Sequence, residues 1–247
     1  MVADEKCYDH PSQYAVSQCR ACGAYLCRDC AEAYGVLTGE YAGQSLCYHC
    51  TTLLVASNIK EVAKLRKTVK REHTGVLVGA SIGALIGLAM GGPIGLLIGF
   101  GAGGSLRHTL TVAGRFIKIL VNPHDENAVT PLSGLALTIL LSPIGTTRKI
   151  VSRIIQLRQA TAILANDQQA LEAMRAYYEY TQFIEKYKGG VDFVKHAREE
   201  LKDNSYAKAI VDKGEESAQR ELRKSVIQIA TNGEIIRSFE DTARKVA

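Results

Sequence analysis

Residues 74–104 read TGVLVGASIGALIGLAMGGPIGLLIGFGAGG and carry no charged side chain. Glycine recurs here at every fourth position, at Gly75, Gly79, Gly83, Gly87, Gly91, Gly95, Gly99 and Gly103. In water, each glycine inside a helix costs about 1 kcal/mol relative to alanine. In lipid the helix is enforced, because its backbone groups have no water to bond. About twenty apolar residues span a bilayer core, so we predict membrane insertion of this stretch.

The regular glycine spacing also predicts how the segment packs. A four-residue step turns about 400° around a helix, so the glycines form a slowly drifting flat groove. Another helix can approach such a groove closely. The pattern resembles the glycine zippers of channels and pore-forming proteins, and this resemblance implies that the eight glycines are oligomerisation contacts.

The topology of residues 75–104 depends on Gly91-Gly92-Pro93 at the midpoint. Thirty helical residues would extend about 45 Å, more than a hydrocarbon core of about 30 Å needs. The Gly-Gly-Pro sequence can kink one tilted span or turn a hairpin. Each hairpin arm would be too short to cross alone. We therefore expect a kinked single span or a re-entrant hairpin within an oligomer, rather than two full crossings.

Two further segments complete a predicted membrane region at 75–146. Residues 105–121 mix basic with apolar side chains and predict an interfacial helix. Residues 128–146 carry no charge, include two prolines and predict a second, weaker span.

Basic residues flank this region on both outer sides. Residues 52–74, a predicted amphipathic juxtamembrane helix, hold six basic and two acidic side chains, and residues 148–158 hold four basic ones. Positive flanks favour the cytoplasm, so we expect an integral membrane protein with both termini cytoplasmic. The polar N-terminus lacks a secretory apolar region, which predicts no cleaved signal peptide. The expected lipid head-group contacts are Lys64, Lys67, Lys70, Arg71, Arg148 and Lys149.

All seven cysteines lie between Cys7 and Cys50, in a predicted module at 1–51. An odd number cannot be used up by intrachain disulfides. With His10 there are eight ligands in four two-residue knuckles, the number that two tetrahedral Zn²⁺ ions need. The spacing of two lets a tight turn direct both side chains at one ion. We therefore predict two zinc ions per chain.

Six of these positions, Cys7, His10, Cys19, Cys22, Cys27 and Cys30, resemble B-box-type zinc fingers, relatives of the RING finger. That family usually ends in two histidines, whereas here Cys47 and Cys50 follow after sixteen residues. The family's cross-brace implies one site of Cys7, His10, Cys27 and Cys30. It implies a second site of Cys19, Cys22, Cys47 and Cys50. His49 could replace a neighbouring ligand, although its spacing favours a bystander.

Both predicted sites are filled by protein ligands, which is typical of structural rather than catalytic zinc. The resemblance implies a protein-interaction module. A ubiquitin-ligase role is an alternative, but the four-residue gap between Cys22 and Cys27 is longer than RING fingers generally use.

Residues 147–247 are rich in charge and predict a cytoplasmic helical domain, a bundle or loose coiled coil. The first expected helix runs from Ile150 to about Tyr187, with a heptad seam that Asp167 interrupts. A second is expected at 191–212 and a third at 215–230, followed by a short amphipathic piece near Phe239. The tyrosines of the first helix are interpreted as core and interface residues.

The remaining composition limits the function. The net charge of +5 is too small for a nucleic-acid polycation, and 6% aromatic residues without tryptophan suit a β-sandwich poorly. The histidines outside the knuckles are isolated and no phosphate loop is present. We expect no enzyme, catalytic residue, nucleic-acid partner or small-molecule substrate in this mainly α membrane protein. The favoured hypothesis is a scaffold that binds lipids, itself and an unknown protein; the alternatives are a homo-oligomeric pore and a ubiquitin-pathway factor.

Overall fold

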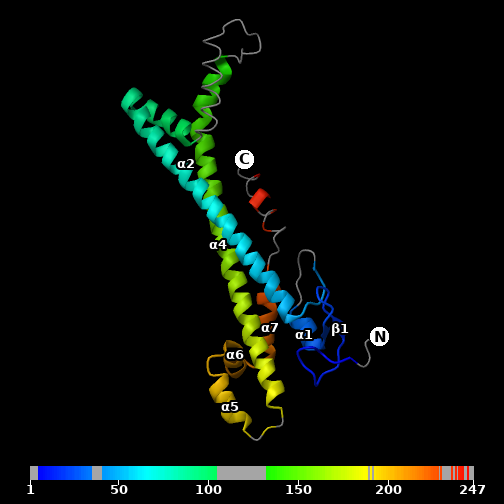
Figure 1. The fold of residues 1–247 in the computed structure, drawn as a ribbon. Helices are drawn as coiled ribbons and strands as arrows, with labels where there is room; N and C mark the ends of the chain where they lie inside the picture. The colour runs from blue at the N-terminus through cyan, green and yellow to red at the C-terminus, as the bar shows by residue number, and fades with distance from the viewer. Residues whose placement is uncertain are drawn as a thin grey trace. The chain divides into compact units, whose positions relative to one another are not determined.

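The chain is mostly helical, in agreement with the predicted class (Figure 1). The computed structural model describes residues 5–34, 41–104, 132–188, 190, 192–227, 229, 235, 237, 239–241 and 244. Its elements are β1 (Ser17–Gln18), β2 (Tyr25–Leu26), α1 (Arg28–Ala33), α2 (Tyr48–Gly104), α4 (Leu132–Lys186), α5 (Phe193–Glu200), α6 (Ser205–Lys213) and α7 (Glu215–Ile227). The predicted interfacial helix at 105–121 lies outside the described residues, as do the first residues of the second apolar segment.

The elements form two compact units, which we describe separately. The head unit comprises residues 1–64 and 160–238, and the hairpin unit comprises residues 65–159 and 239–247. The long helices α2 and α4 each contribute to both units. The predicted boundaries at 51/52 and 146/147 therefore do not coincide with the limits of the compact units.

In the head unit, the cysteine-rich module and the C-terminal helices share one hydrophobic core. The strands β1 and β2 pair antiparallel, with Ser17 opposite Leu26. Helix α1 packs against α7, which in turn packs against α6. The largest fully buried side chains of this core come from every part of the unit: Tyr34, Leu26, Leu46, Met174, Leu222, Ile229, Val55 and Val226.

Aromatic rings make the contact between the two parts of this core. Tyr48 at the start of α2 stacks on Tyr178 of α4, with ring centroids 4.0 Å apart. Tyr34, which follows α1, meets the edge of Tyr177 at 6.0 Å. Offset-stacked and edge-to-face pairs each contribute about 0.5–1.5 kcal/mol beyond the area they bury. The α4 tyrosines thus act as core residues.

The C-terminal helices differ from the prediction at one point. The helix expected at 191–212 is divided into α5 and α6, because Asn204 starts a new helix. Its side chain accepts a hydrogen bond from the Ala207 N–H, the usual role of an N-cap residue. The expected third helix corresponds to α7, and most of the piece near Phe239 lies outside the described residues.

Helix α4 buries a face that the sequence indicated only as a partly filled second seam, containing Ala160 and Met174. The predicted seam of Leu157, Leu164 and Leu171 is only half-buried. The fully buried positions include Ala160, Asp167 and Met174, themselves spaced by seven residues. Asp167 therefore lies within the buried face, where neither carboxylate oxygen has a hydrogen-bond partner among the described residues.

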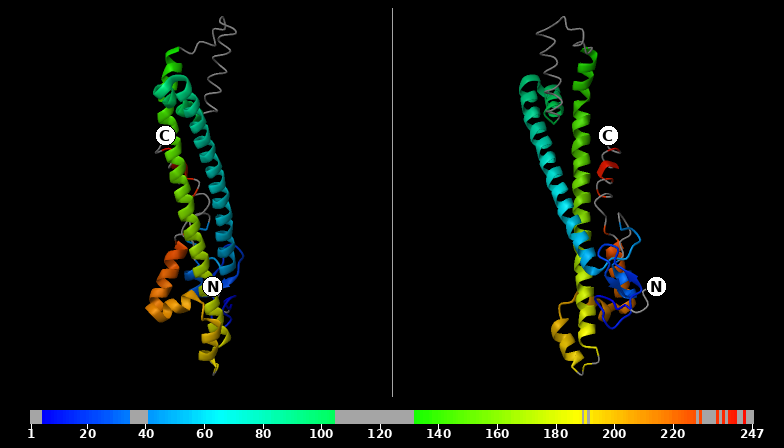
Figure 2. Two further views of the ribbon diagram at one scale, coloured as in Figure 1. Left: turned by 90° about the vertical axis from the view of Figure 1, so that its left-hand side faces the viewer. Right: turned by 45° about the vertical axis from the view of Figure 1, so that its right-hand side comes forward.

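In the hairpin unit, α2 turns back on itself near its end (Figure 2). The reversal occurs at Gly91 and Gly92, where Gly92 has φ +61°, a left-handed conformation that favours glycine. Pro93 begins the second arm, where its missing N–H costs no helical hydrogen bond. The predicted break is therefore a hairpin turn and not the kink of a single span.

The glycines bring the two arms into backbone contact. Gly79 faces Gly103, Gly83 faces Gly99, and Gly87 faces Gly95. A Cβ atom on Gly87 would lie 2.7 Å from the Gly95 carbonyl carbon, and one on Gly99 equally close to that of Gly83. No side chain larger than hydrogen fits between the arms. Gly75 and Gly91 have no such neighbour within 4 Å.

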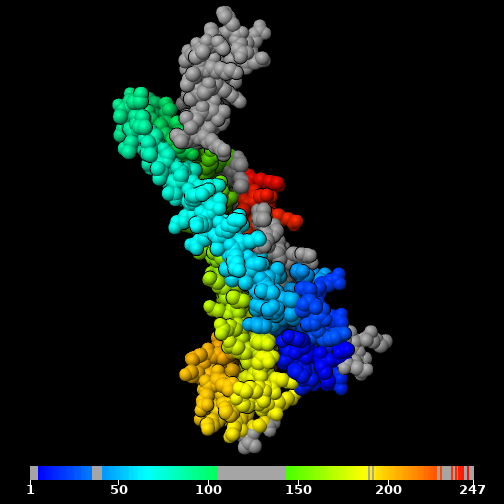
Figure 3. Space-filling view, in the orientation of Figure 1, coloured from blue at the N-terminus to red at the C-terminus, as the bar shows by residue number. Residues whose placement is uncertain are grey.

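The outer surface of the hairpin is apolar, and the other described residues leave it uncovered. Figure 3 shows one face of this part of α2 in space-filling form. Its exposed large side chains are Leu77, Val78, Ile82, Leu85, Ile86, Leu88, Met90, Ile94 and Leu97. Of the described helices, only α2 is long and apolar enough to cross a membrane, and its apolar window is not buried within the structure. A core helix of a soluble protein would be mostly covered instead.

Substituting Gly83 with leucine should open the hairpin, because a side chain at this position collides with the backbone of Gly99 and Gly103. Fluorescent labels carried by non-natural amino acids at Leu85 and Leu97, which are both exposed, would report the separation of the arms by energy transfer. We expect efficient transfer in the wild type and in Gly75→Leu, and a clear loss in Gly83→Leu. Equal transfer in all three chains would contradict the glycine contact.

Replacing Asp167 by asparagine should stabilise the head unit most at high pH. Burial raises the pKa of Asp167 from 3.8 to about 7, so the folded state binds this proton more tightly than the unfolded chain. Stability is therefore lost as the pH rises from about 4 to 7. We expect the gain from Asp167→Asn to grow by about 2 kcal/mol between pH 5.5 and 8, measured by denaturation of the full chain. Glu172→Gln, an exposed change on the same helix, should show no such growth.

Candidate metal centres

Four short turns position the predicted metal ligands. Cys7 and His10 lie in a loop that Gln13 closes: the Cys7 N–H donates to the Gln13 carbonyl at 3.0 Å, and the Gln13 N–H donates to the His10 carbonyl at 2.9 Å. Cys19 and Cys22 stand in the turn between β1 and β2, where Gly23 adopts φ +77°. Cys27 precedes α1 and Cys30 lies in its first turn. Cys47 immediately precedes α2 and Cys50 lies in its first turn.

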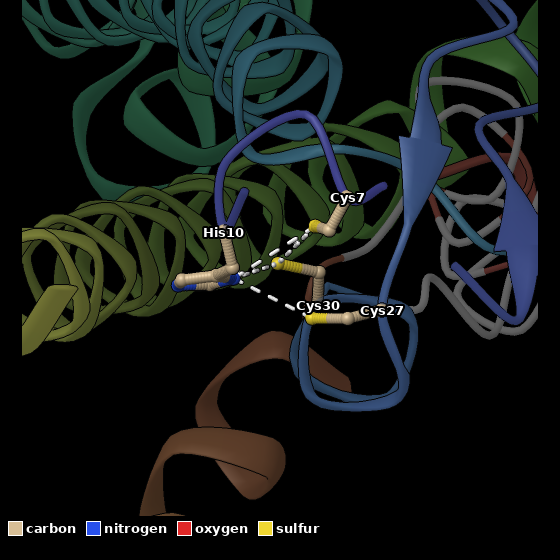
Figure 4. Close-up of side chains that lie close together, drawn as sticks. All are labelled: Cys7, His10, Cys27 and Cys30. Carbon is tan, nitrogen blue, oxygen red and sulfur yellow. Dashed lines mark hydrogen bonds between the residues drawn. The ribbon is translucent and has the colours of Figure 1, made fainter. Parts of the chain in front are cut away.

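The first cluster joins Cys7, His10, Cys27 and Cys30, all of them buried (Figure 4). His10 Nδ1 lies 3.2 Å from the Cys30 sulfur, 3.4 Å from that of Cys27 and 3.8 Å from that of Cys7. Ligands 2.0–2.3 Å from one tetrahedral ion stand about 3.3–3.8 Å apart. The cluster therefore has the dimensions of a zinc site.

The second cluster joins Cys19, Cys22, Cys47 and Cys50, whose sulfur atoms all lie within 4.8 Å of one another. The sulfur atoms of Cys22 and Cys47 are 3.7 Å apart. Cys22 is exposed, so this site lies nearer the surface than the first. The Cys50 N–H donates to the Cys47 sulfur at 3.4 Å, a contact that stabilises a thiolate.

The crowding of these groups perturbs their protonation. Hydrogen bonds with Cys27 and Cys7 raise the pKa of His10 to about 10. Hydrogen bonds with Cys27 and Cys30 lower the pKa of Cys7, whereas hydrogen bonds with Cys27 and Cys7 raise the pKa of Cys30. At Cys19, burial raises the thiol pKa, but backbone N–H groups outweigh it and lower the pKa to about 7. Several ionised thiols so close together require a positive charge between them, and His10 or a metal ion can supply it.

The donor sets identify the kind of ion. Thiolate and imidazole in sets of four suit Zn²⁺, whereas calcium and magnesium prefer oxygen. The two groups of four can therefore bind two metal ions, with zinc consistent with both. The protein already supplies four ligands at each site, and this is the arrangement of a structural metal.

The structure brings together the two sets of four that the B-box resemblance implied. His49 belongs to neither cluster; its side chain is exposed and its carbonyl accepts a hydrogen bond from Thr52 at 2.9 Å. The expected head-group residues are all exposed on their helices. Of the expected oligomerisation glycines, six are engaged between the hairpin arms of one chain.

Sequence reasoning missed the polar contacts that fix the first cluster against α4. Glu185 accepts hydrogen bonds from both the N–H and the hydroxyl of Ser12, each at 2.9 Å. The Gln182 amide donates to the Asp9 carbonyl at 2.8 Å. On the opposite side, the guanidinium of Arg223 on α7 pairs with Glu32 of α1. These pairs join residues more than 170 positions apart, and no local pattern reveals them.

No protein-family model, curated protein or solved structure matches this chain.

Metal analysis of the full chain should find about two zinc ions, and the double variant Cys27→Ser with Cys30→Ser should retain about one. His49→Ala is the matched control and should retain two. Loss of the first site should also expose α4 and α7 to amide hydrogen exchange, because its ligands lie in the core that these helices share. Fewer than one zinc ion per wild-type chain would contradict both sites.

Since bound thiols must be deprotonated, zinc should be released from the chain as the pH falls.

Proposed function

We propose that the protein is a membrane-anchored, zinc-stapled scaffold without enzymatic activity. The observation that carries this proposal is the α2 hairpin. Its glycines pack between its two arms, and its large apolar side chains are exposed on the outside. An uncovered apolar surface of this kind is unfavourable in water and marks a membrane or protein contact. A lipid environment satisfies it along the whole hairpin.

The dimensions of the hairpin favour a re-entrant insertion. The arms at 75–90 and 93–104 are about 24 Å and 18 Å long at 1.5 Å per residue. Both are shorter than a hydrocarbon core of about 30 Å. A re-entrant hairpin returns the chain to the side from which it entered. This agrees with the basic flanks, and with cytoplasmic positions for both termini.

The head unit supports recruitment of a partner rather than catalysis. At each described cluster the protein can supply all four ligands of one ion, which would leave no open position for a substrate. A B-box-type module would serve as an interaction surface. The shared core joins this module to the C-terminal helices, so both would present one common surface to a partner. Exposed lysines and arginines such as Lys67, Lys70 and Arg148 would contact anionic head groups.

Self-association is proposed to occur along an apolar groove of the hairpin. The groove encloses about 790 Å³ and runs beside the glycine seam, with Val78, Ile82, Ile86 and Met90 at its edge. Small residues at its floor allow a second hairpin to approach closely. Its lining has no polar side chain, so a path built from such grooves would offer ions no ligands. For this reason we favour the scaffold hypothesis over the pore hypothesis.

Membrane insertion can be tested with charges on the hairpin surface. The double variant Leu85→Lys with Leu97→Lys should be released from membranes by alkaline carbonate, while the wild type stays in the pellet. Each lysine costs about 2.5–3.5 kcal/mol in a bilayer. Val151→Lys, at an exposed apolar position of α4, is the matched control and should remain membrane-bound. Release of the wild type would contradict the proposal, and ion conductance by purified protein in planar bilayers would favour the pore.

A further inference from the structure

A polar cavity of about 220 Å³ lies beside the first metal cluster in the head unit. Its walls come from the cysteine-rich module and from α4, α6 and α7, and include His10, Asp29, Tyr177, Tyr180, Tyr206 and Glu215. The volume is below the 300–1,000 Å³ that is usual for drug-sized ligands. It therefore suits one side chain or a small ion better than a larger molecule.

Three tyrosine rings stand at steep angles to one another in this cavity. Tyr177 and Tyr206 meet edge to face, with centroids 5.0 Å apart and an interplanar angle of 80°. Tyr180 and Tyr206 are 5.4 Å apart at 59°. Rings in this arrangement offer a ligand several aromatic surfaces at once. The face of an aromatic ring is electron-rich and attracts cations within about 6 Å.

Two of the tyrosine hydroxyls are left open in the cavity. Tyr177 and Tyr206 are only 5% and 7% exposed. Among the described residues, neither hydroxyl has a hydrogen-bond partner. Neither oxygen is among the fully buried unpaired polar atoms, so both hydroxyls are accessible from the cavity that their residues line and are available to a bound group.

The charge of the cavity is negative. Asp29 and Glu215 line it and form no ion pair with another described residue. Glu185 is engaged by Ser12, whose hydroxyl also accepts from Lys188 at 3.1 Å, so these two charges largely offset each other. When a divalent ion is bound at the adjacent site, its three thiolate ligands would add a further net negative charge. Burial and the charge of Glu215 together raise the pKa of Tyr206 to about 12.

We propose that this cavity binds an alkylammonium group, held by the faces of Tyr177, Tyr180 and Tyr206 and by the carboxylates of Asp29 and Glu215. The ammonium N–H groups would donate to these carboxylates and to the open hydroxyls. The alkyl stem would lie against the rings. The group comes from a lysine of a partner polypeptide or from a free amine, which share this chemistry. The site deepens the proposed recruitment function but does not require membrane insertion.

Calorimetry with the zinc-loaded full chain in detergent tests the site. The probes are Nα-acetyl-lysine methylamide, butane-1,4-diamine and the uncharged Nα-acetyl-norleucine methylamide. We expect saturable binding of at least one ammonium probe, weakening with added salt, and none of the norleucine derivative. The tighter of the two ammonium probes identifies a polypeptide or a free amine as the source. Binding of neither, or equal binding of norleucine, would overturn the proposal.

Matched variants assign the binding to this cavity. Asp29→Asn with Glu215→Gln should weaken ammonium binding at least tenfold. Asp212→Asn with Glu216→Gln removes the same charge outside the cavity and should change it less than twofold. Tyr180→Leu should cost about fivefold, and Tyr180→Phe, which keeps the ring, should not. Unaltered zinc content would show that each variant is folded, and equal affinities throughout would exclude this site. Carbonate extraction tests the membrane proposal separately.

Discussion

Three thiols and an imidazole packed within 4.8 Å of one another need a cation between them before the thiols can all be ionised. The head unit depends on this constraint. Its two strands have only two residues each, too few to be stable alone, and its sulfur atoms occupy part of the hydrophobic core. A metal ion bound in each cluster would convert that liability into a cross-link. It would then hold Tyr34 and Leu26 in the core that they share with α4 and α7.

The hairpin unit is governed by a different constraint, the space available between two backbones. Gly83 and Gly99 approach so closely that even a methyl group would collide. In water every glycine lowers the stability of such a helix. In lipid, glycines let the two helix backbones approach closely and gain dispersion contacts that leucine side chains would prevent. Because the small residues face inward, the large ones face outward, and this division makes the hairpin apolar on its surface. Six of the eight glycines that resemble an oligomer interface are therefore used first within one chain.

Local patterns predicted those features that depend on short spacing. The paired knuckles predicted the eight ligands, Gly91-Gly92-Pro93 predicted a break, and the charge-free stretch predicted the apolar helix. Features that depend on distant contacts were not predictable. The contact between Tyr34 and Tyr177 joins residues that are far apart in the sequence. Asp167 was interpreted as an interruption of the heptad seam, because its burial is set by tertiary packing that the local sequence does not show. Asn204 is an intermediate case: asparagine is a favoured N-cap residue, but the expected helix at 191–212 ran through it, so the break between α5 and α6 was not predicted.

The constraint at the first metal cluster also reaches the cavity beside His10. The Nδ1 atom of His10 faces the three sulfur atoms, whereas the other ring nitrogen points away from them (Figure 4). The same residue lines the cavity, together with Asp29, which lies between the ligands Cys27 and Cys30. A metal ion bound by these ligands would hold the loop against the walls from α4, α6 and α7. If the cavity binds a cation as proposed, thermodynamic linkage would then require that metal and cation favour each other's binding. A metal site that is structural by its coordination would thereby govern the proposed recruitment without taking part in any reaction.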